Sequence, residues 1–195
     1  METLFSEKVV TYTGTELRTG WLAQTFGVGP EALVAWLGPC HVATADLVDL
    51  EDQRAGAEIH AAMMLHFIAE HPGRDLLLTV LRQRLLVAGA LQVLHRDPQA
   101  VPGGAWGQCL SQLQRQGDDL YLSERKLSVS IATLSPTSGL IHFALNVDPS
   151  GAPVPAIGLA ELGVDPRLFA HRLLKQYGEE MESAVAACRK VREVV

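Results

Sequence analysis

Cysteine is scarce in this 195-residue chain, which has three copies at positions 40, 109 and 188. An odd number of widely separated cysteines argues against a disulfide framework and against a zinc knuckle, whose ligands come in close pairs. The first ten residues, METLFSEKVV, include acids and have no apolar stretch of signal-peptide length. We therefore expect a mature protein that works in a reducing cytoplasm.

Basic residues are outnumbered as well. The chain has 16 Lys and Arg against 22 Asp and Glu, so its formal net charge is −6. This balance removes the diffuse positive field on which non-specific binding to nucleic-acid phosphates depends. We expect no extended nucleic-acid surface.

A long uncharged hydrophobic run is also missing. The most apolar region, residues 76–94, carries Arg82 and Arg84 near its middle. Charges in the centre of a membrane span are costly, so this region predicts a buried amphipathic helix and no membrane contact.

Apolar residues are nevertheless plentiful, at 48% of the chain with 19% charged. A chain of this length and composition can bury one core, so we expect a single domain over residues 1–195. Strand-like runs, a long helix, further strands and a final helix follow one another, which favours an α+β fold. We expect a mixed, largely antiparallel sheet packed by the long central helix and the C-terminal helix.

The individual elements are predicted from periodicity and from turn residues. In the first part of the chain we expect a helix over 16–26 capped by Thr15, two strands separated by a reverse turn at Gly38-Pro39, and a strand over 61–71. In the second part we expect a helix from Asp75 to about His95, a loop over 96–108, and an antiparallel meander of strands 118–123, 126–134 and 139–147. A final helix is expected from Asp165-Pro166. Its apolar stripe consists of Leu168, Leu173, Leu174, Tyr177 and Met181.

The meander begins with the hairpin GDDLYLSERKLSVSIA at residues 117–132. Alternation along its second strand places Leu127, Val129 and Ile131 on one face. The other face carries Lys126, Ser128, Ser130 and Ala132. This polar, small-sided face is typical of a cleft floor and equally of a solvated surface, so the residue pattern leaves both interpretations open.

A second polar cluster lies in the segment DLVDLEDQR, where Asp46, Asp49, Glu51 and Asp52 precede Arg54. Asp49, Glu51 and Asp52 could hold Mg²⁺ or a substrate amine, and His66 could join them. The alternative is an acidic turn with a helix-capping aspartate. Arg18 and Trp21 share a helical face and could line a ligand pocket, or could simply pack there.

The segment DDLYLSERKLSVSIA resembles a motif of biotin and lipoate protein ligases, in which an Asn-Asp-containing strand turns into an Arg-Lys-Leu strand. The next strand, LIHFALNVD, is similar to the strand that follows in lipoyl and octanoyl transferases. With VDLEDQR, RKLSVSIATLSP and AIGLAELGVDP included, nearly the whole chain is most similar to a small prokaryotic family, a domain of unknown function grouped with those ligases on the class II aminoacyl-tRNA synthetase-like fold.

The resemblance implies roles for several residues. Lys126 matches a lysine that contacts the acyl carbonyl and phosphate of an acyl-adenylate, so Lys126 and His142 become candidate catalytic residues. A small carboxylic acid or acyl donor is the implied substrate, with ATP and Mg²⁺ if adenylation occurs, and with an acceptor protein as a further partner. The match implies that Arg54, Asp118, Asp119 and Asn146 bind the substrate. Ser128 and Ser130 join these candidates from the polar face of the hairpin, and His66 and Arg18 join them from the residue patterns given above.

The chain also departs from these families. Asp118 replaces the asparagine of the Asn-Asp pair, and QRAGAEIHA has fewer glycines than the phosphate-binding turn of the ligases. The segment VPAIGLAEL lacks the cysteine nucleophile of the transferases, which argues against that route of thioester transfer. We therefore keep three hypotheses: a ligase or acyltransferase, a non-catalytic small-molecule-binding module, and a homo-oligomer paired through strand edges.

Overall fold

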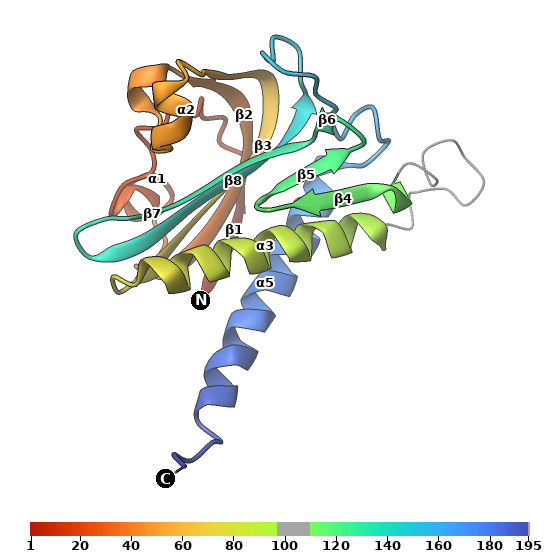
Figure 1. The fold of residues 1–195 in the computed structure, drawn as a ribbon. Coiled ribbons are helices and arrows are strands. Elements are labelled where there is room, and N and C mark those ends of the chain that lie inside the picture. Colours follow the sequence, from red (N-terminus) through yellow and green to blue (C-terminus); the bar gives the residue numbers. More distant parts are fainter. Residues whose placement is uncertain (97–109, 195) are drawn as a thin grey trace.

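The computed structural model describes residues 1–96 and 110–194, and its framework is a five-stranded mixed sheet (Figure 1). The strand order is β1-β2-β3-β8-β7. β1 runs parallel to β2, and every other neighbouring pair in this sheet is antiparallel. The strands span Glu2–Ser6 (β1), Ala32–Val42 (β2), Ile59–Pro72 (β3), Ser128–Leu134 (β7) and Ser138–Asp148 (β8).

Two long helices cover one face of the sheet, as predicted. α3 spans Leu76–His95 and α5 spans Pro166–Cys188. Each begins at an aspartate whose carboxylate accepts backbone N–H groups of the first turn: Asp75 accepts from Leu78, and Asp165 accepts from Arg167 and Leu168. Such caps satisfy donors that would otherwise lack partners, which explains why both helix starts were readable from the sequence.

Alternation along the central strands gives the sheet two apolar faces. Phe67 and Phe143 point toward α3 and α5, where they join a core that includes Phe169. Ile68 and Ala144 point the other way, into a second core with Trp36. The second core is covered by the chain before β2, which includes α1 (Trp21–Phe26), and by η1 (Thr44–Asp46). The short helix α2 (Leu50–Arg54) lies beyond η1. Because the second face carries no long helix, it can hold a cavity.

The predicted reverse turn at Gly38-Pro39 is wrong, because β2 continues through both residues. The register with β3 shifts between Gly38 and Cys40, which marks a β-bulge. Proline is tolerated at a bulge because its missing N–H falls where the ladder is already interrupted. Gly38 is required by sterics as well, since a Cβ there would lie 2.0 Å from the Val10 carbonyl oxygen.

The predicted meander is only partly correct. β7 and β8 do form an antiparallel pair, but the run 118–123 leaves the main sheet and forms β5 (Asp119–Leu122) of a small three-stranded sheet. That sheet also contains β4 (Leu113–Gln116) and β6 (Arg125–Lys126). The expected strand 126–134 breaks at Leu127, whose side chain is fully buried in the core beneath the helices.

Three other expectations need comment. The helix over 16–26 is shorter than predicted, because Gly20 adopts a left-handed conformation at its start and Thr15 bonds to Thr13 and Glu16 instead of capping it. Leu168 is exposed, whereas Leu173, Leu174 and Tyr177 are buried as predicted. The loop expected over 96–108 lies almost entirely outside the described residues.

Candidate functional site

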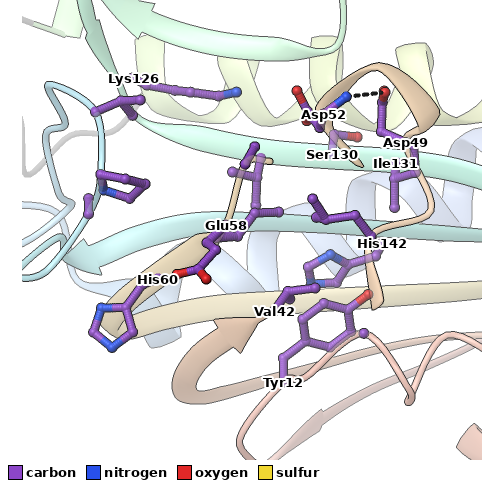
Figure 2. Close-up of a pocket in the computed structure, with 18 of the residues that line it drawn as sticks. Tyr12, Val42, Asp49, Asp52, Glu58, His60, Lys126, Ser130, Ile131 and His142 are labelled. Atoms are coloured by element: carbon purple, nitrogen blue, oxygen red, sulfur yellow. Dashed lines mark hydrogen bonds between the residues drawn. The ribbon is translucent and has the colours of Figure 1, made fainter. Parts of the chain in front are cut away.

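A cavity of about 390 Å³ opens on the face of the sheet opposite α3 and α5. Figure 2 shows Lys126 on one side of it, His142 and Tyr12 on the other, and the acidic segment around Asp49 and Asp52 at its rim. Its apolar lining includes Val42, Leu47, Ala57, Ile59, Met64, Val129, Ile131 and Ala156. A cavity of this size with an apolar body and a few polar groups has the character of a small-molecule site.

Lys126 and Asp119 form an ion pair in the cavity wall, with Lys126 Nζ 2.7 Å from Asp119 Oδ2. The turn between β5 and β6 brings them together, since Lys126 pairs with Tyr121 across that hairpin. The backbone of Lys126 is held from two directions, because its N–H donates to the Pro155 carbonyl and its own carbonyl accepts from Asn146 Nδ2. These bonds fix the backbone of Lys126, and the ion pair with Asp119 holds its ammonium.

Burial raises the pKa of Asp119, and the neighbouring ammonium of Lys126 offsets this only in part. For Lys126, burial opposes the charged form, but the Asp119 carboxylate outweighs it and leaves the pKa raised. Asp119 Oδ1 is buried and has no hydrogen-bond partner among residues 1–96 and 110–194. An unsatisfied carboxylate oxygen beside a cation is a place where a ligand N–H or O–H can bind.

His142 and His66 form a buried relay behind the cavity floor. His142 Nε2 lies 3.1 Å from His66 Nδ1, and His66 Nε2 lies 3.2 Å from the carbonyl oxygen of Gly38. A carbonyl only accepts, so His66 carries its proton on Nε2 and accepts on Nδ1 from His142 Nε2–H. The bulge at Gly38 is what directs this carbonyl toward His66.

Both histidines of the relay are neutral near pH 7. Burial lowers the pKa of His66 to about 4 and holds the pKa of His142 well below its ordinary value, with the proximity of His66 a second cause. Tyr12 stacks on His142, with ring centroids 3.7 Å apart and planes 13° apart. With Nε2 protonated, His142 keeps a lone pair on Nδ1, and the residue lines the cavity. It can accept a hydrogen bond but is too weak a base to take a proton at neutral pH.

Carboxylates outnumber cations around the cavity. Six lining residues are acidic, against one lysine: Asp46, Asp49, Asp52, Glu58, Asp118 and Asp119. Asp49 is already used as the cap of α2, where it accepts from the N–H groups of Glu51 and Asp52. Among the described residues no group of three or more His, Cys, Asp or Glu side chains is placed to hold a metal ion.

The charged residues that line the cavity do not fit a nucleoside triphosphate with its Mg²⁺. A triphosphate needs several cations or converging backbone N–H groups, and an excess of carboxylates repels it. Arg54, the predicted anion contact, is exposed at the end of α2 and does not line the cavity. The residues expected to bind Mg²⁺ are also not gathered, because Glu51 lies outside the lining that contains Asp49 and Asp52.

The structure brings only part of the predicted site together. Asp118, Asp119, Lys126, Ser130, His142 and Asn146 line the cavity together with Asp49 and Asp52. Asp118 is tied to α3, because it accepts from Gln83 Nε2 and lies 3.5 Å from the Arg84 guanidinium. The remaining predicted residues lie elsewhere: His66 behind His142, Ser128 inside the core, and Arg18, Glu51 and Arg54 at the surface.

After the break at Leu127, the side chains of strand 126–132 point to the opposite faces of the sheet from those predicted. Ser128 and Ser130 are opposite Leu145 and Phe143, on the helix side of the sheet. Ser128 Oγ accepts from the N–H of Leu120, and Ser130 Oγ accepts from Gln83. Val129 and Ile131 line the cavity from the other face, so its floor is apolar where we expected serines. Of the two serines only Ser130 lines the cavity, at the edge strand β7.

Several lining residues were not predicted from the sequence. Tyr12, Glu58 and His60 lie in segments without a recognisable motif. Glu58 directly precedes β3 and His60 is near its start, but the pairing of β3 with β2 is irregular between Ala61 and Met64, so simple alternation along the strand could not have placed them. Nothing in the local sequence around Tyr12 indicates that it stacks on a histidine far along the chain.

The fold is that of the biotin and lipoate protein ligases. A mutant of biotin protein ligase from Aquifex aeolicus in complex with biotin superposes with a TM-score of 0.57 at 14% identity, covering 93% of this chain and 70% of that one. A T. acidophilum protein provisionally described as a lipoate protein ligase, with bound lipoic acid, gives a TM-score of 0.52 at 12% identity, covering 92% and 87%. At such identities the likeness concerns the fold alone.

Within this class the chain belongs to the family described as a domain of unknown function, DUF366, whose model matches residues 1–192. A protein of unknown function from Pyrococcus horikoshi is 39% identical with a TM-score of 0.86, covering 100% of this chain and 99% of that one. The uncharacterized protein MJ0805 of Methanocaldococcus jannaschii is 32% identical over 97% of this chain and 84% of its own length.

Proposed function

We propose that this protein binds a small carboxylic acid or its acyl thioester, with the apolar chain in the cavity and the carbonyl at Lys126. From the thioester it transfers the acyl group to a nucleophilic acceptor, forming the new acyl bond as the thiol leaves. The observation that carries the proposal is the ammonium of Lys126, held by Asp119 in the wall of a cavity that has an apolar floor and acidic surroundings. A positioned cation next to a carbonyl stabilises the negative charge that develops on its oxygen when a nucleophile attacks.

The surrounding charges favour a neutral acyl compound over a polyanion. Six carboxylates near one lysine give the cavity an acidic field, which disfavours a free nucleotide but not an acyl carbonyl. His142 then acts as a fixed hydrogen-bond acceptor for an O–H or N–H on the ligand, since its pKa is too low for proton uptake at neutral pH. We further propose that the reaction takes place in the cytoplasm and that the acceptor is another small molecule or a protein.

The second candidate is a binding module on the same fold that performs no chemistry. The same acidic rim supports it, because among residues 1–96 and 110–194 the cavity lining offers no cation set for ATP and no cysteine. An acid would then be bound and released unchanged. The two candidates share the ligand and differ only in turnover.

The test is a panel of apolar carboxylic acids and their acyl thioesters, measured first by thermal shift. A ligand at ten times its dissociation constant adds about 1.4 kcal/mol of stability. We expect stabilisation by at least one member of the panel and a loss of affinity of about tenfold or more in Lys126→Met. The matched control is Arg125→Met, which removes the neighbouring cation that pairs with Glu161 outside the cavity.

Acyl transfer is then measured with the ligand found, using an amine acceptor and detecting the released thiol. Release in the wild-type protein and its loss in Lys126→Met support the acyltransferase. Binding without release supports the binding module. If no acid or thioester stabilises the protein, or if Lys126→Met binds as well as the wild type, the proposal fails.

A further inference from the structure

α3 carries a stripe of exposed leucines on the side that faces away from the sheet. Leu77, Leu81 and Leu85 are 69%, 56% and 39% exposed and lie at successive intervals of four residues. Residues at this spacing share one face of a helix, so they form a continuous apolar surface. By length and composition α3 resembles a membrane-spanning helix. Only 33% of its most apolar 18-residue stretch is buried inside the fold, so much of its apolar surface is uncovered.

The second half of α5 extends beyond the body of the protein, as Figure 1 shows for the blue helix. From Glu179 to Cys188 the side chains are exposed except that of Met181, which is partly buried. Met181, Ala184, Val185 and Cys188 continue the apolar stripe that the first half of α5 packs against the core. A short helical segment without packing is marginally stable in water, so this half of α5 has the features of a helix that lacks a partner.

The two surfaces meet in a groove where α5 crosses α3. This groove has a volume of about 250 Å³, and its lining includes Leu85 and Gly89 of α3 and Glu180 of α5. The exposed leucines therefore continue into a concavity at the crossing. A second helix laid along the leucines would enter this groove.

The charges of the two surfaces are complementary. α3 contains Arg82 and Arg84 and no acidic residue, and of the two Arg84 also lies 3.5 Å from Asp118 of the same copy. The exposed half of α5 begins with Glu179, Glu180 and Glu182. Helices of opposite charge that each expose an apolar stripe attract one another and bury both stripes. Repulsion would oppose two copies of α3 facing each other, so the pairing of α5 with α3 is favoured.

We propose that the protein forms a two-fold symmetric dimer in which the exposed half of α5 from one copy packs along the leucine stripe of α3 in the other. In a two-fold dimer this contact occurs twice, because each copy supplies one α3 and one α5. It leaves the cavity open, since no residue of the leucine stripe or of the exposed half of α5 lines that cavity. The dimer thus covers the helix layer and is independent of the proposed acyl chemistry.

The test is the molecular mass in solution by sedimentation velocity between about 1 and 100 µM, a range in which a dimer with a micromolar dissociation constant dissociates measurably. We expect a dimer for the wild type. Leu77→Gln with Leu81→Gln, and separately Val185→Glu, should weaken dimerisation by at least about tenfold. These side chains are exposed within one copy, so the variants should fold normally. Val9→Gln, at an exposed valine away from both helices, is the control and should remain dimeric.

Charge reversal adds a specific readout. Glu180→Arg with Glu182→Arg should dissociate the dimer, and adding Arg82→Glu should restore part of the affinity. A monomeric wild type overturns the proposal. So does a dimer unaffected by both the leucine and the Val185 changes. A monomer that sediments with phosphatidylcholine vesicles only when Leu77 and Leu81 are intact would also overturn it, and would assign the stripe to a membrane surface.

Discussion

Lys126 Nζ and Asp119 Oδ2 lie 2.7 Å apart, and their side chains are 28% and 16% exposed. A pair so little exposed is sensitive to the loss of one partner, because the remaining charge keeps its burial cost without compensation. Arg125 and Glu161 form a neighbouring pair that is 42% exposed on each side, so water stabilises either charge alone. The two pairs make a matched comparison, since their cations are neighbours on β6.

We predict that Lys126→Met destabilises the fold by about 1–3 kcal/mol, because it leaves the raised-pKa carboxylate of Asp119 unpaired. Adding Asp119→Asn should recover most of this loss, which gives a large coupling energy in a double-mutant cycle. The same cycle on Arg125→Gln and Glu161→Gln should give a coupling energy of less than about 1 kcal/mol. Urea unfolding measures all variants, and additive losses at Lys126 and Asp119 would refute the ion-pair argument.

The histidine relay predicts defined tautomers. His66 and His142 should both be protonated on Nε2 and not on Nδ1, since the Gly38 carbonyl orders the two hydrogen bonds. Long-range ¹H–¹⁵N NMR correlations distinguish the tautomers, and neutral rings should persist down to about pH 5 because burial lowers the pKa of His66 to about 4. Exposed His171 serves as the internal reference. A proton found on Nδ1 of His142 would show that the relay runs in the opposite direction.

The same burial makes stability depend on pH in a definite direction. Burial lowers the pKa of His66 and of His71 to about 4, with the positive charge of Arg82 a further cause at His71, whereas an unfolded histidine titrates near pH 6.5. Between these values the unfolded chain binds more protons, so stability is complete above about pH 6.5 and is lost as the pH falls toward 4.

Each buried histidine should contribute a slope of up to about 1 kcal/mol per pH unit in that range. Urea unfolding at pH 7, 6 and 5 measures the total slope. His66→Gln should reduce it, while His171→Gln, at an exposed position, should not. An unchanged slope in His66→Gln would mean that His66 binds protons equally in the folded and unfolded states, so that burial does not lower its pKa.

Gly38→Ala should destabilise the protein by more than about 2 kcal/mol, because the added Cβ would lie 2.0 Å from a backbone oxygen that cannot move independently. The change should also disturb the His66 ring, since the carbonyl of Gly38 is its acceptor. Gly29→Ala is the control, as its Cβ would be 3.4 Å from the flexible carboxylate of Glu2. Equal stability of the two variants would show that the bulge relaxes to make room.

Local features of the sequence were enough for much of the fold. The caps at Asp75 and Asp165 and the 3.6-residue periodicity predicted α3 and α5, and alternation predicted β3, β7 and β8. The proximity of Lys126 to Asp119 also follows from a short hairpin, because few residues separate them. Each of these depends on interactions between residues close in sequence, where side-chain type largely decides the outcome.

The site itself depends on contacts between distant residues, and only the tertiary structure decided them. The sequence could not indicate that Leu127 would enter the helix-side core and so turn Ser128 and Ser130 away from the cleft. Nor could it show that Gly38 bulges toward His66, which in turn orients His142. Alternation sets which side chains share a face, but the depth of burial and the register between strands determine which face becomes the cavity.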